Sequence, residues 1–421
     1  MFNLKKVILI FGTPSSFLLD SLLGNPIKLF KQGYYNMELR KFRNILPPLL
    51  IFLSSVFIFS CMSPVLQNEI NEEPLIRVLI DRLPPYGKIE FKSKGTFTVI
   101  GGSLFGKAIE NRIEIKANES GLVINDSPSE TDTVEIYSSS TISYNGIEYP
   151  GIFRVVLTNG YIYLINVLPL EQYLECVVPS EMPATWSIEA LKAQAITSRT
   201  YALYSIKNSK NILFDVYASY KSQVYKGLRN LHPKSTRAVI DTRGLVITHK
   251  DEIIPAFFHA TSGGFIEDSS LLLDKSLPYL KPSVDNFSKF NYRSRWDTTI
   301  SAREFSKIIF GSENITIKEI IIPYRLPSGS VKEVNIIGIT KNGEEISNII
   351  SVHKLRELIP SILSPKFSVE LKDKVIKFSG YGWGHGVGLS QWGSKEMAEQ
   401  GYNYREIIKF YFKDTDITRL Y

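Results

Sequence analysis

Short hydrophobic runs separated by polar turns dominate the chain from residue 76 to about residue 167. The runs at 77–80, 97–100 and 162–165 are examples, and Gly, Asn and Ser residues lie between such runs. Apolar runs of this length with such boundaries are typical of β-strands. We therefore expect antiparallel β-structure with few helices in this part of the chain.

Beyond residue 168 the apolar residues recur with a helical period. Pro169 opens a segment with apolar residues at i, i+3, i+4 and i+7, which predicts an amphipathic helix. We expect this helix to break at 178–183, where two prolines lie, and a second helix to run from Ser187 as N-cap to about Tyr204. The positions that define the two helices are Leu170, Tyr173, Leu174 and Val177, and Ile188, Leu191, Ala195 and Ala202.

The rest of the chain mixes strand patterns with short helices. Residues 244–262 and 317–380 have strand patterns, with one short helix expected near 353–358. A loop at 382–388 leads to a predicted helix at 389–399. This order predicts an α+β fold with mixed and antiparallel β-structure and a helical segment in its middle. A last helix is predicted from Tyr404, Ile407, Ile408 and Tyr411.

A charged segment, a short apolar run and a cysteine follow Met37. The apolar run, 45–59, is shorter than the ~20 residues that a membrane-spanning helix needs, and the whole pattern is typical of a secretory signal. Cys61 follows the small residue Ser60, and this junction resembles a bacterial lipobox, in which Cys61 would be lipidated. The alternative is an uncleaved anchor with an incidental cysteine. Either arrangement exports the remainder of the chain to the cell envelope and tethers it to a membrane.

The segments around this signal predict the domain order. Residues 1–36 hold a weaker apolar stretch that no export signal requires, so we expect translation to begin at Met37. The predicted order is a non-native upstream extension (1–36), a lipoprotein signal peptide or anchor (37–61), a flexible polar tether (62–74) and a folded domain (75–421). Within the folded domain we expect a β-rich part at 75–167, a part with the candidate catalytic segment at 168–300, and a second β-rich part with C-terminal helices at 301–421.

The positive charge of the chain is concentrated near its start. The formal net charge is +7, and residues 1–61 contribute +5 of it, through seven Lys and Arg against two acidic residues. The remainder carries only +2 and has no Lys/Arg block that could follow a phosphate backbone, so we expect no nucleic-acid partner. Two cysteines, Cys61 and Cys176, are too few for a disulfide framework or a cysteine-based zinc site.

One glutamate lies between two prolines in an apolar setting. Pro179 and Pro183 restrict the backbone on either side of Glu181, and its other neighbours are mostly apolar. Poor solvation raises the pKa of a carboxyl, as a general acid for a glycosidic oxygen requires near neutral pH. The alternative is an exposed loop residue.

Residues 379–393 are unusually dense in glycine and tryptophan. Glycine lets another group approach the backbone closely, but the segment lacks the Lys-Ser/Thr of a P-loop and any Gly-x-Gly-x-x-Gly register. Tryptophan faces with the polar tips of His385, Ser390 and Gln391 suit a sugar cleft. The alternative is a tightly packed turn between a strand and a helix.

His259 and Ser262 lie three residues apart in His-Ala-Thr-Ser-Gly-Gly. Such residues could act as base and nucleophile, but no Gly-x-Ser-x-Gly elbow is present, which argues against a serine hydrolase. A structural histidine is the alternative for His259. The chain also offers no histidine spacing typical of zinc ligands, because His232, His249 and His353 are scattered.

Three segments resemble the motifs of one protein family. Residues 168–202, which contain Pro-Ser-Glu-Met-Pro, closely resemble the signature of the SpoIID/LytB family of stage II sporulation protein D and LytB amidase enhancer proteins. Gly-Trp-Gly-His-Gly-Val-Gly-Leu-Ser-Gln-Trp-Gly at 382–393 is similar to its second motif, and residues 259–264 are similar to its third. Order and spacing also agree, and the resemblance spans roughly residues 76–421.

The resemblance implies a SpoIID-like fold and a lytic transglycosylase that acts on peptidoglycan. Such an enzyme cleaves the β-1,4 bond between N-acetylmuramic acid and N-acetylglucosamine and leaves a 1,6-anhydro end. The family's catalytic acid falls on Glu181, which would act without a second carboxylate and without a cofactor. Family members favour glycan stripped of its stem peptides, so glycan strands and an N-acetylmuramoyl-L-alanine amidase are the expected partners.

Further residues are expected to line the substrate cleft, although Arg199 could equally be a structural ion-pair partner. Some relatives hold zinc with His and Cys near the third motif, but residues 260–261 are Ala-Thr here with no Cys nearby, so we expect no metal. Cys176 stands where the family pattern has Gly, and we interpret it as a small core residue. The residues expected to line the cleft are Arg199, Tyr201, His259, Ser262, His385, Ser390 and Gln391.

Two other functions stay open at this point. A non-catalytic protein of the LytB type would bind peptidoglycan and stimulate an amidase, and it would tolerate the loss of Glu181. An envelope structural or adhesive lipoprotein would explain the tether, but not Glu181 or the glycine-rich segment. Glu181 within its full motif favours the enzyme. A role in sporulation does not follow from the resemblance, because one fold can serve any wall remodelling.

Overall fold

The computed structural model describes residues 72–102, 105–118, 121–273, 275–288 and 294–421. The upstream extension, the signal peptide and the lipidation site Cys61 therefore lie outside the described residues. Within the described ranges, no helix is both long and apolar enough to cross a membrane.

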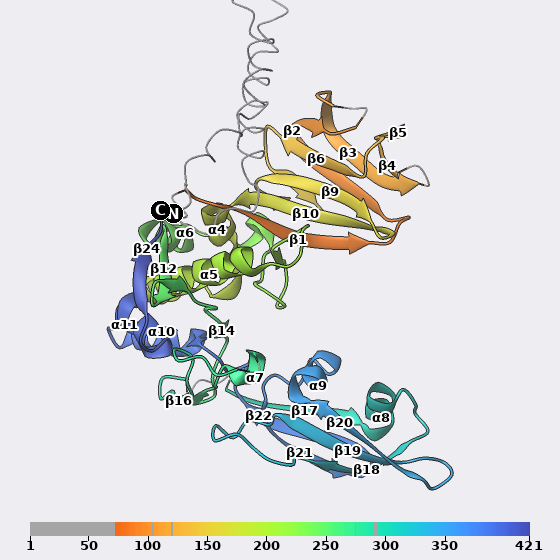
Figure 1. Ribbon diagram of the computed structural model, residues 1–421, viewed down its shortest axis with the longest axis vertical. Coiled ribbons are helices and arrows are strands. Elements are labelled where there is room, and N and C mark those ends of the chain that lie inside the picture. The colour runs from red at the N-terminus through yellow and green to blue at the C-terminus, as the bar shows by residue number, and fades with distance from the viewer. Residues whose placement is uncertain (1–71, 103–104, 119–120, 274, 289–293) are drawn as a thin grey trace, which may run out of the picture. The chain divides into compact units, whose positions relative to one another are not determined.

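Residues 75–169 form one sheet, completed by the short strand β11 (Val216–Tyr217), in which the strand order is β11-β1-β10-β9-β6-β2-β3-β4-β5 (Figure 1). Its pairs are antiparallel except for β11, which joins β1 in parallel. The described residues of this part contain no helix, so the predicted antiparallel β-structure is confirmed. The strands are β1 (Leu75–Leu83), β2 (Lys88–Ile100), β3 (Ala108–Asn118), β4 (Gly121–Ile124), β5 (Ser127–Pro128), β6 (Thr133–Ser138), β7 (Ile142–Tyr144), β8 (Ile147–Tyr149), β9 (Ile152–Thr158) and β10 (Tyr161–Pro169).

Alternation of buried residues gives this sheet its apolar face. Ile76 and Val78 of β1 and Ile89 and Phe91 of β2 are fully buried, whereas most residues between and beside them are partly exposed. Side chains with a two-residue period face the same side of a sheet. These residues share one hydrophobic cluster with α4 (Leu170–Glu181) and α5 (Ile188–Asn208), and α4 contacts β1 and β10 (Figure 1).

The predicted helix break at 178–183 is wrong at its start, because α4 continues through Pro179 and ends at Glu181. A proline inside a helix removes one backbone donor. The hydroxyl of Ser180 donates to the carbonyl oxygen of Cys176 at 2.8 Å, which adds a hydrogen bond beside the proline. Glu181 therefore lies at the end of a helix and not in an exposed loop.

The second predicted helix is confirmed as α5, and it runs to Asn208. Ser187 is its N-cap and accepts the backbone N–H of Glu189 at 3.4 Å. Three helices of the described residues were not predicted, namely α6 (Pro233–Asp241), α7 (Ser270–Leu273) and α8 (Ala302–Phe310). The prediction that Cys176 is a small core residue is confirmed, since its side chain is fully buried.

The C-terminal segment returns to pack against α5. β12 (Leu245–His249) pairs with β13 (Glu252–Ile253) and β24 (Asp416–Arg419), and β14 (Phe258–His259) pairs in parallel with β23 (Leu389–Ser390). Because 389–390 form this strand, the helix predicted at 389–399 begins two residues later, as α10 (Gln391–Glu399). The last predicted helix is confirmed as α11 (Tyr404–Tyr411), and both α10 and α11 contact α5.

Residues 295–381 have a hydrophobic cluster of their own, built from two three-stranded sheets and two helices. The short helix predicted near 353–358 is confirmed as α9. The elements are β17 (Arg295–Ser301), β18 (Thr316–Ile321), β19 (Glu333–Ile339), β20 (Glu345–Ser351), β21 (Lys366–Lys372), β22 (Val375–Tyr381), α8 and α9 (Val352–Leu358). The remaining elements are η1 (Gly227–Asn230), β15 (Phe265–Ile266), α7 (Ser270–Leu273) and β16 (Ser283–Val284).

The α+β fold class is confirmed by this arrangement of mixed and antiparallel sheets with helices. The predicted division into parts at 168–300 and 301–421 stays a prediction. Apolar packing joins residues 387–412 to residues 193–280 in one cluster, whereas residues 296–378 form another.

Candidate functional site

Glu181 projects its carboxyl from the last residue of α4. Its Oε1 accepts the backbone N–H of Val224 at 2.6 Å, and the side chain of Gln391 also hydrogen-bonds to it. The residue as a whole is partly exposed. Burial of its carboxyl group nevertheless raises the pKa of this group above its usual 4.5, although both hydrogen bonds and the positive charge of Lys226 oppose this rise. The group can therefore hold a proton at a higher pH than a solvated carboxyl.

Segments far apart in the sequence meet at Glu181. Gln391 comes from the start of α10, and its Nε2 donates to Oε1 of Gln194 on α5 at 3.4 Å. The rings of Trp186 and Trp392 pack edge to face with their centroids 4.9 Å apart, which joins the α4–α5 loop to α10. The first two family motifs are thus brought together around the predicted catalytic acid.

Tyr201 lies on α5 within electrostatic range of Glu181. Burial raises the pKa of its phenol, and the charge of Glu181 adds to this effect. Its ring packs edge to face on Phe257 and Phe258, with centroid distances of 6.2 Å and 6.4 Å. Tyr201 and Gln391 are the two predicted substrate-binding residues whose interactions reach Glu181.

Arg199 is fully buried and forms a two-pronged ion pair with Glu171 of α4. Its Nε and Nη2 donate to the two carboxylate oxygens of Glu171, each at 2.7 Å. The remaining nitrogen, Nη1, donates to the carbonyl oxygen of Leu245 at 3.1 Å. The guanidinium has no face open to a ligand in this structure, and its surroundings match the structural ion pair that the sequence left as an alternative.

The glycine-rich loop is packed against residues 257–267 of the same chain. Thr261 pairs with Trp383, and Glu267 with Val387, in isolated β-bridges. A Cβ on Gly388 would lie 2.1 Å from the carbonyl oxygen of Phe257. The glycines therefore allow residues 257–267 of the same chain to approach the loop backbone closely. This arrangement matches the tightly packed turn that the sequence left as an alternative.

His259 and His385 pack edge to face beside this loop, with ring centroids 5.6 Å apart. Val387 fixes both rings: its carbonyl oxygen lies 3.1 Å from Nδ1 of His259, and its N–H donates to Nδ1 of His385 at 3.1 Å. Burial lowers the pKa of both rings, that of His385 to about 3, so both are neutral at neutral pH. No hydrogen bond joins either ring to Glu181 among the described residues.

Ser262 and Ser390 belong to a buried polar network around Asp285, which the sequence analysis did not identify. Asp285 accepts the hydroxyl hydrogens of Ser262 at 2.7 Å and of Ser288 at 2.5 Å. Ser288 and Ser390 share a hydrogen bond at 2.6 Å. All four residues are buried, and no local pattern distinguishes Asp285 from an ordinary surface aspartate.

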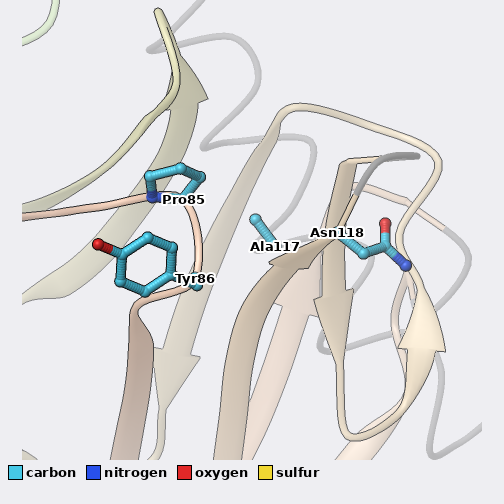
Figure 2. A pocket seen from close by; sticks show the side chains of 4 residues that line it. All are labelled: Pro85, Tyr86, Ala117 and Asn118. Carbon is cyan, nitrogen blue, oxygen red and sulfur yellow. The ribbon is translucent and has the colours of Figure 1, made fainter.

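In the part of the chain that the structure describes, no three His, Cys, Asp or Glu side chains gather as metal ligands. The expectation that no metal is bound stays a prediction. Figure 2 shows a pocket lined by Pro85, Tyr86, Ala117 and Asn118, and none of the predicted site residues lines it.

Comparison with known proteins shows which sequences are similar. The profile of the family described as "Stage II sporulation protein" matches residues 158–249, a range that includes Glu181. An uncharacterized protein of Brachyspira hyodysenteriae is 32% identical over 312 residues, which cover 73% of this chain and 81% of that protein. The stage II sporulation protein D of Bacillus amyloliquefaciens is 31% identical over 60% of this chain and 75% of its own length. An amidase enhancer of Bacillus subtilis is 27% identical over 68% of this chain and 46% of its own length.

Proposed function

Because the chain belongs to the stage II sporulation protein D family, we propose that it is a lytic transglycosylase with Glu181 as its single catalytic acid. The family and the amidase enhancer among the relatives support a cell-wall-related function. The proposed substrate is the glycan strand of peptidoglycan, cut between N-acetylmuramic acid and N-acetylglucosamine.

The observation that carries this proposal is the environment of the Glu181 carboxyl. Burial raises its pKa, while the Val224 N–H at 2.6 Å and Gln391 fix its position. A carboxyl that is oriented and has a raised pKa can deliver its proton to a glycosidic oxygen at a higher pH than a solvated carboxyl can. The same hydrogen bonds then stabilise the carboxylate that remains.

The proposed reaction needs one such group. Glu181 protonates the oxygen that leaves with N-acetylglucosamine, and the bond from that oxygen to C1 of the muramoyl residue breaks. The C6 hydroxyl oxygen of the same muramoyl residue attacks C1, and its proton passes to the Glu181 carboxylate. The acid is regenerated and no water is consumed, in contrast to hydrolases that use two carboxylates.

The wider setting belongs to the same proposal. The chain acts on strands whose stem peptides an amidase has removed, and it works outside the cell, tethered to a membrane through a lipid on Cys61. The amidase enhancer among the relatives supports an amidase as a partner. A lipid on the purified protein, detected by mass spectrometry, would test the tether.

Digestion of amidase-stripped peptidoglycan tests the enzyme. We compare the wild type with Glu181→Gln and, as a matched control, with Glu175→Gln, a half-buried glutamate on the same helix whose pKa burial also raises. Mass spectrometry should find 1,6-anhydro-muramoyl products with the wild type and Glu175→Gln, and a loss of at least about a hundredfold with Glu181→Gln.

A second function is favoured by the similarity to an amidase enhancer. If the wild type binds stripped glycan and releases no sugar, while it accelerates an added amidase equally well with Glu181 or Gln at this position, the chain is an amidase enhancer and not a transglycosylase.

A further inference from the structure

A lysine without a partner lies next to the candidate acid. The Lys226 side chain is exposed, and its ammonium group makes no hydrogen bond or ion pair in the described part of the chain. It follows by two residues Val224, whose N–H binds Glu181 at 2.6 Å. Two residues of extended chain span about 7 Å, so the Lys226 backbone lies within that distance of the Val224 backbone, and a lysine side chain can cover a similar length.

The backbone around Lys226 is held on both sides. On one side Val224 is bound to Glu181, and on the other Asn230 Nδ2 donates to the Ser180 hydroxyl at 3.3 Å. Gly227 packs so closely that a Cβ there would lie 2.3 Å from the carbonyl oxygen of Glu148. A fixed backbone with a free ammonium group places a positive charge near Glu181, and this charge lowers the pKa of that carboxyl.

Other lysines near the helix ends have roles within the protein. Lys192 pairs with Glu189 and Asp241, both at 3.4 Å, and Lys234 donates to the carbonyl oxygen of Trp186. Lys226 has no comparable role in the fold. A cation that the fold leaves unpaired beside a reactive carboxyl is suited to an anionic group on the substrate.

We propose that Lys226 binds the lactyl carboxylate of the muramic acid residue that is being cleaved, an inference that rests on the proposed function. The lactyl group is an ether at C3 of the same ring whose C1 is attacked, so it lies close to the reacting bond. While a stem peptide is attached, the lactyl group ends in a neutral amide. After an amidase has acted, it ends in a carboxylate, and only this form offers Lys226 an opposite charge. Lys226 thus selects stripped strands.

The test varies the charge on both partners. Stripped glycan is compared with the same glycan after its lactyl carboxylates are converted to methylamides with a carbodiimide and methylamine. The full chain is assayed as wild type, Lys226→Gln and Lys226→Arg. The control is Lys221→Gln, which changes an exposed lysine of the same segment that lies over the Tyr217 ring.

We expect the wild type to cleave carboxylate glycan with about tenfold higher kcat/KM than methylamide glycan, with most of the difference in KM. Lys226→Gln should lose this preference, Lys226→Arg should keep it, and Lys221→Gln should match the wild type. Added salt should reduce the preference, because it screens exposed charges.

Two results would overturn the inference. The first is a Lys226→Gln protein that keeps the full preference for carboxylate glycan. The second is a wild type without any preference. If the first result came with a shifted pH profile, it would assign Lys226 to the tuning of the Glu181 pKa instead.

A binding measurement distinguishes a failure of this inference from a failure of the proposed function. Affinity for the two glycans is measured by co-sedimentation with Glu181→Gln alone and with Glu181→Gln combined with Lys226→Gln. If the wild type releases no sugar, but the single variant prefers carboxylate glycan and the double variant does not, the transglycosylase fails while the role of Lys226 stands. Equal binding of both glycans by the single variant would contradict the role of Lys226.

Discussion

Glu181 illustrates at the scale of one residue how a reactive group can be costly to the fold. Burial makes its ionised form unfavourable, and the hydrogen bonds from Val224 and Gln391 offset only part of that cost, because the pKa stays raised. The features that suit Glu181 to proton transfer therefore also destabilise the folded chain whenever the carboxyl is ionised.

We expect Glu181→Gln to increase the free energy of unfolding at neutral pH. The pKa of Glu181 is higher in the folded than in the unfolded chain. The stability that its protonated form contributes is present below the unfolded pKa and is lost as the pH rises through the folded pKa. Glutamine cannot ionise, so the variant avoids this loss of stability. The loss is about 1.4 kcal/mol for each unit by which the folded and unfolded pKa values differ.

Urea unfolding of both proteins at about pH 4 and about pH 8 measures this effect, with a gain expected only at the higher pH. Glu252→Gln serves as a control, because the hydrogen bond from Lys207 lowers the pKa of that exposed glutamate. It should show no gain. Equal gains for Glu181→Gln at both pH values would show that ionisation is not the cause.

At the scale of elements, the glycine-rich loop at 382–388 connects β22 to β23. β14 and β23 pair in parallel beside it, and Gly388 lies directly before β23. A side chain at this position would meet the backbone of Phe257, which cannot rotate away as a flexible side chain can. The glycine therefore preserves the pairing that holds α10, and with it Gln391, near Glu181.

Gly388→Ala should destabilise the chain more than Gly343→Ala. Both glycines have positive φ, 74° and 85°, so the backbone strain of alanine is similar. Only Gly388 has an atom within 2.1 Å of the new Cβ, whereas Gly343 has nothing within 4 Å. We expect an additional loss of about 1–3 kcal/mol for Gly388→Ala. Equal losses in urea unfolding would mean that the loop yields to the added methyl group.

At the scale of the whole molecule, the Glu171–Arg199 pair joins distant parts of the chain. Glu171 also accepts the hydroxyl of the C-terminal residue Tyr421 at 2.7 Å, and Arg199 donates to the carbonyl oxygens of Val239 on α6 and Leu245 on β12. One buried ion pair thus connects four helices and strands with the end of the chain. Its loss should be felt by the whole folded unit.

Arg199→Met should lower the free energy of unfolding by about 3–5 kcal/mol, because it leaves the Glu171 carboxylate buried without its partner. Adding Glu171→Leu should recover much of this loss. Arg243→Met, which breaks an exposed pair with Glu73, should cost less than about 1 kcal/mol. If Arg199→Met abolished sugar release and left unfolding unchanged, Arg199 would be a substrate contact and not a structural residue.

Local patterns predicted much of the fold and one part of the site. The strands of residues 75–169 and the helices α5, α9 and α11 follow from alternation, period and caps, which act over a few residues. The continuation of α4 through Pro179 could not be predicted in this way, because packing of α4 on the sheet outweighs the local preference of proline. The N-cap Ser301 is a local signal for the start of α8, a helix that the hydrophobic pattern did not predict.

The sequence by itself determined that Glu181 is set among apolar neighbours, that the chain is α+β, and that it has the motifs of its family. These properties depend on residue type and on short-range order. The tertiary structure alone decided that Val224 and Gln391 bind Glu181, that Arg199 is neutralised by Glu171, and that residues 257–267 fill the space beside the glycines. Such contacts join segments tens to hundreds of residues apart. Their partners are chosen by how the sheets and helices pack, and no local pattern records that choice.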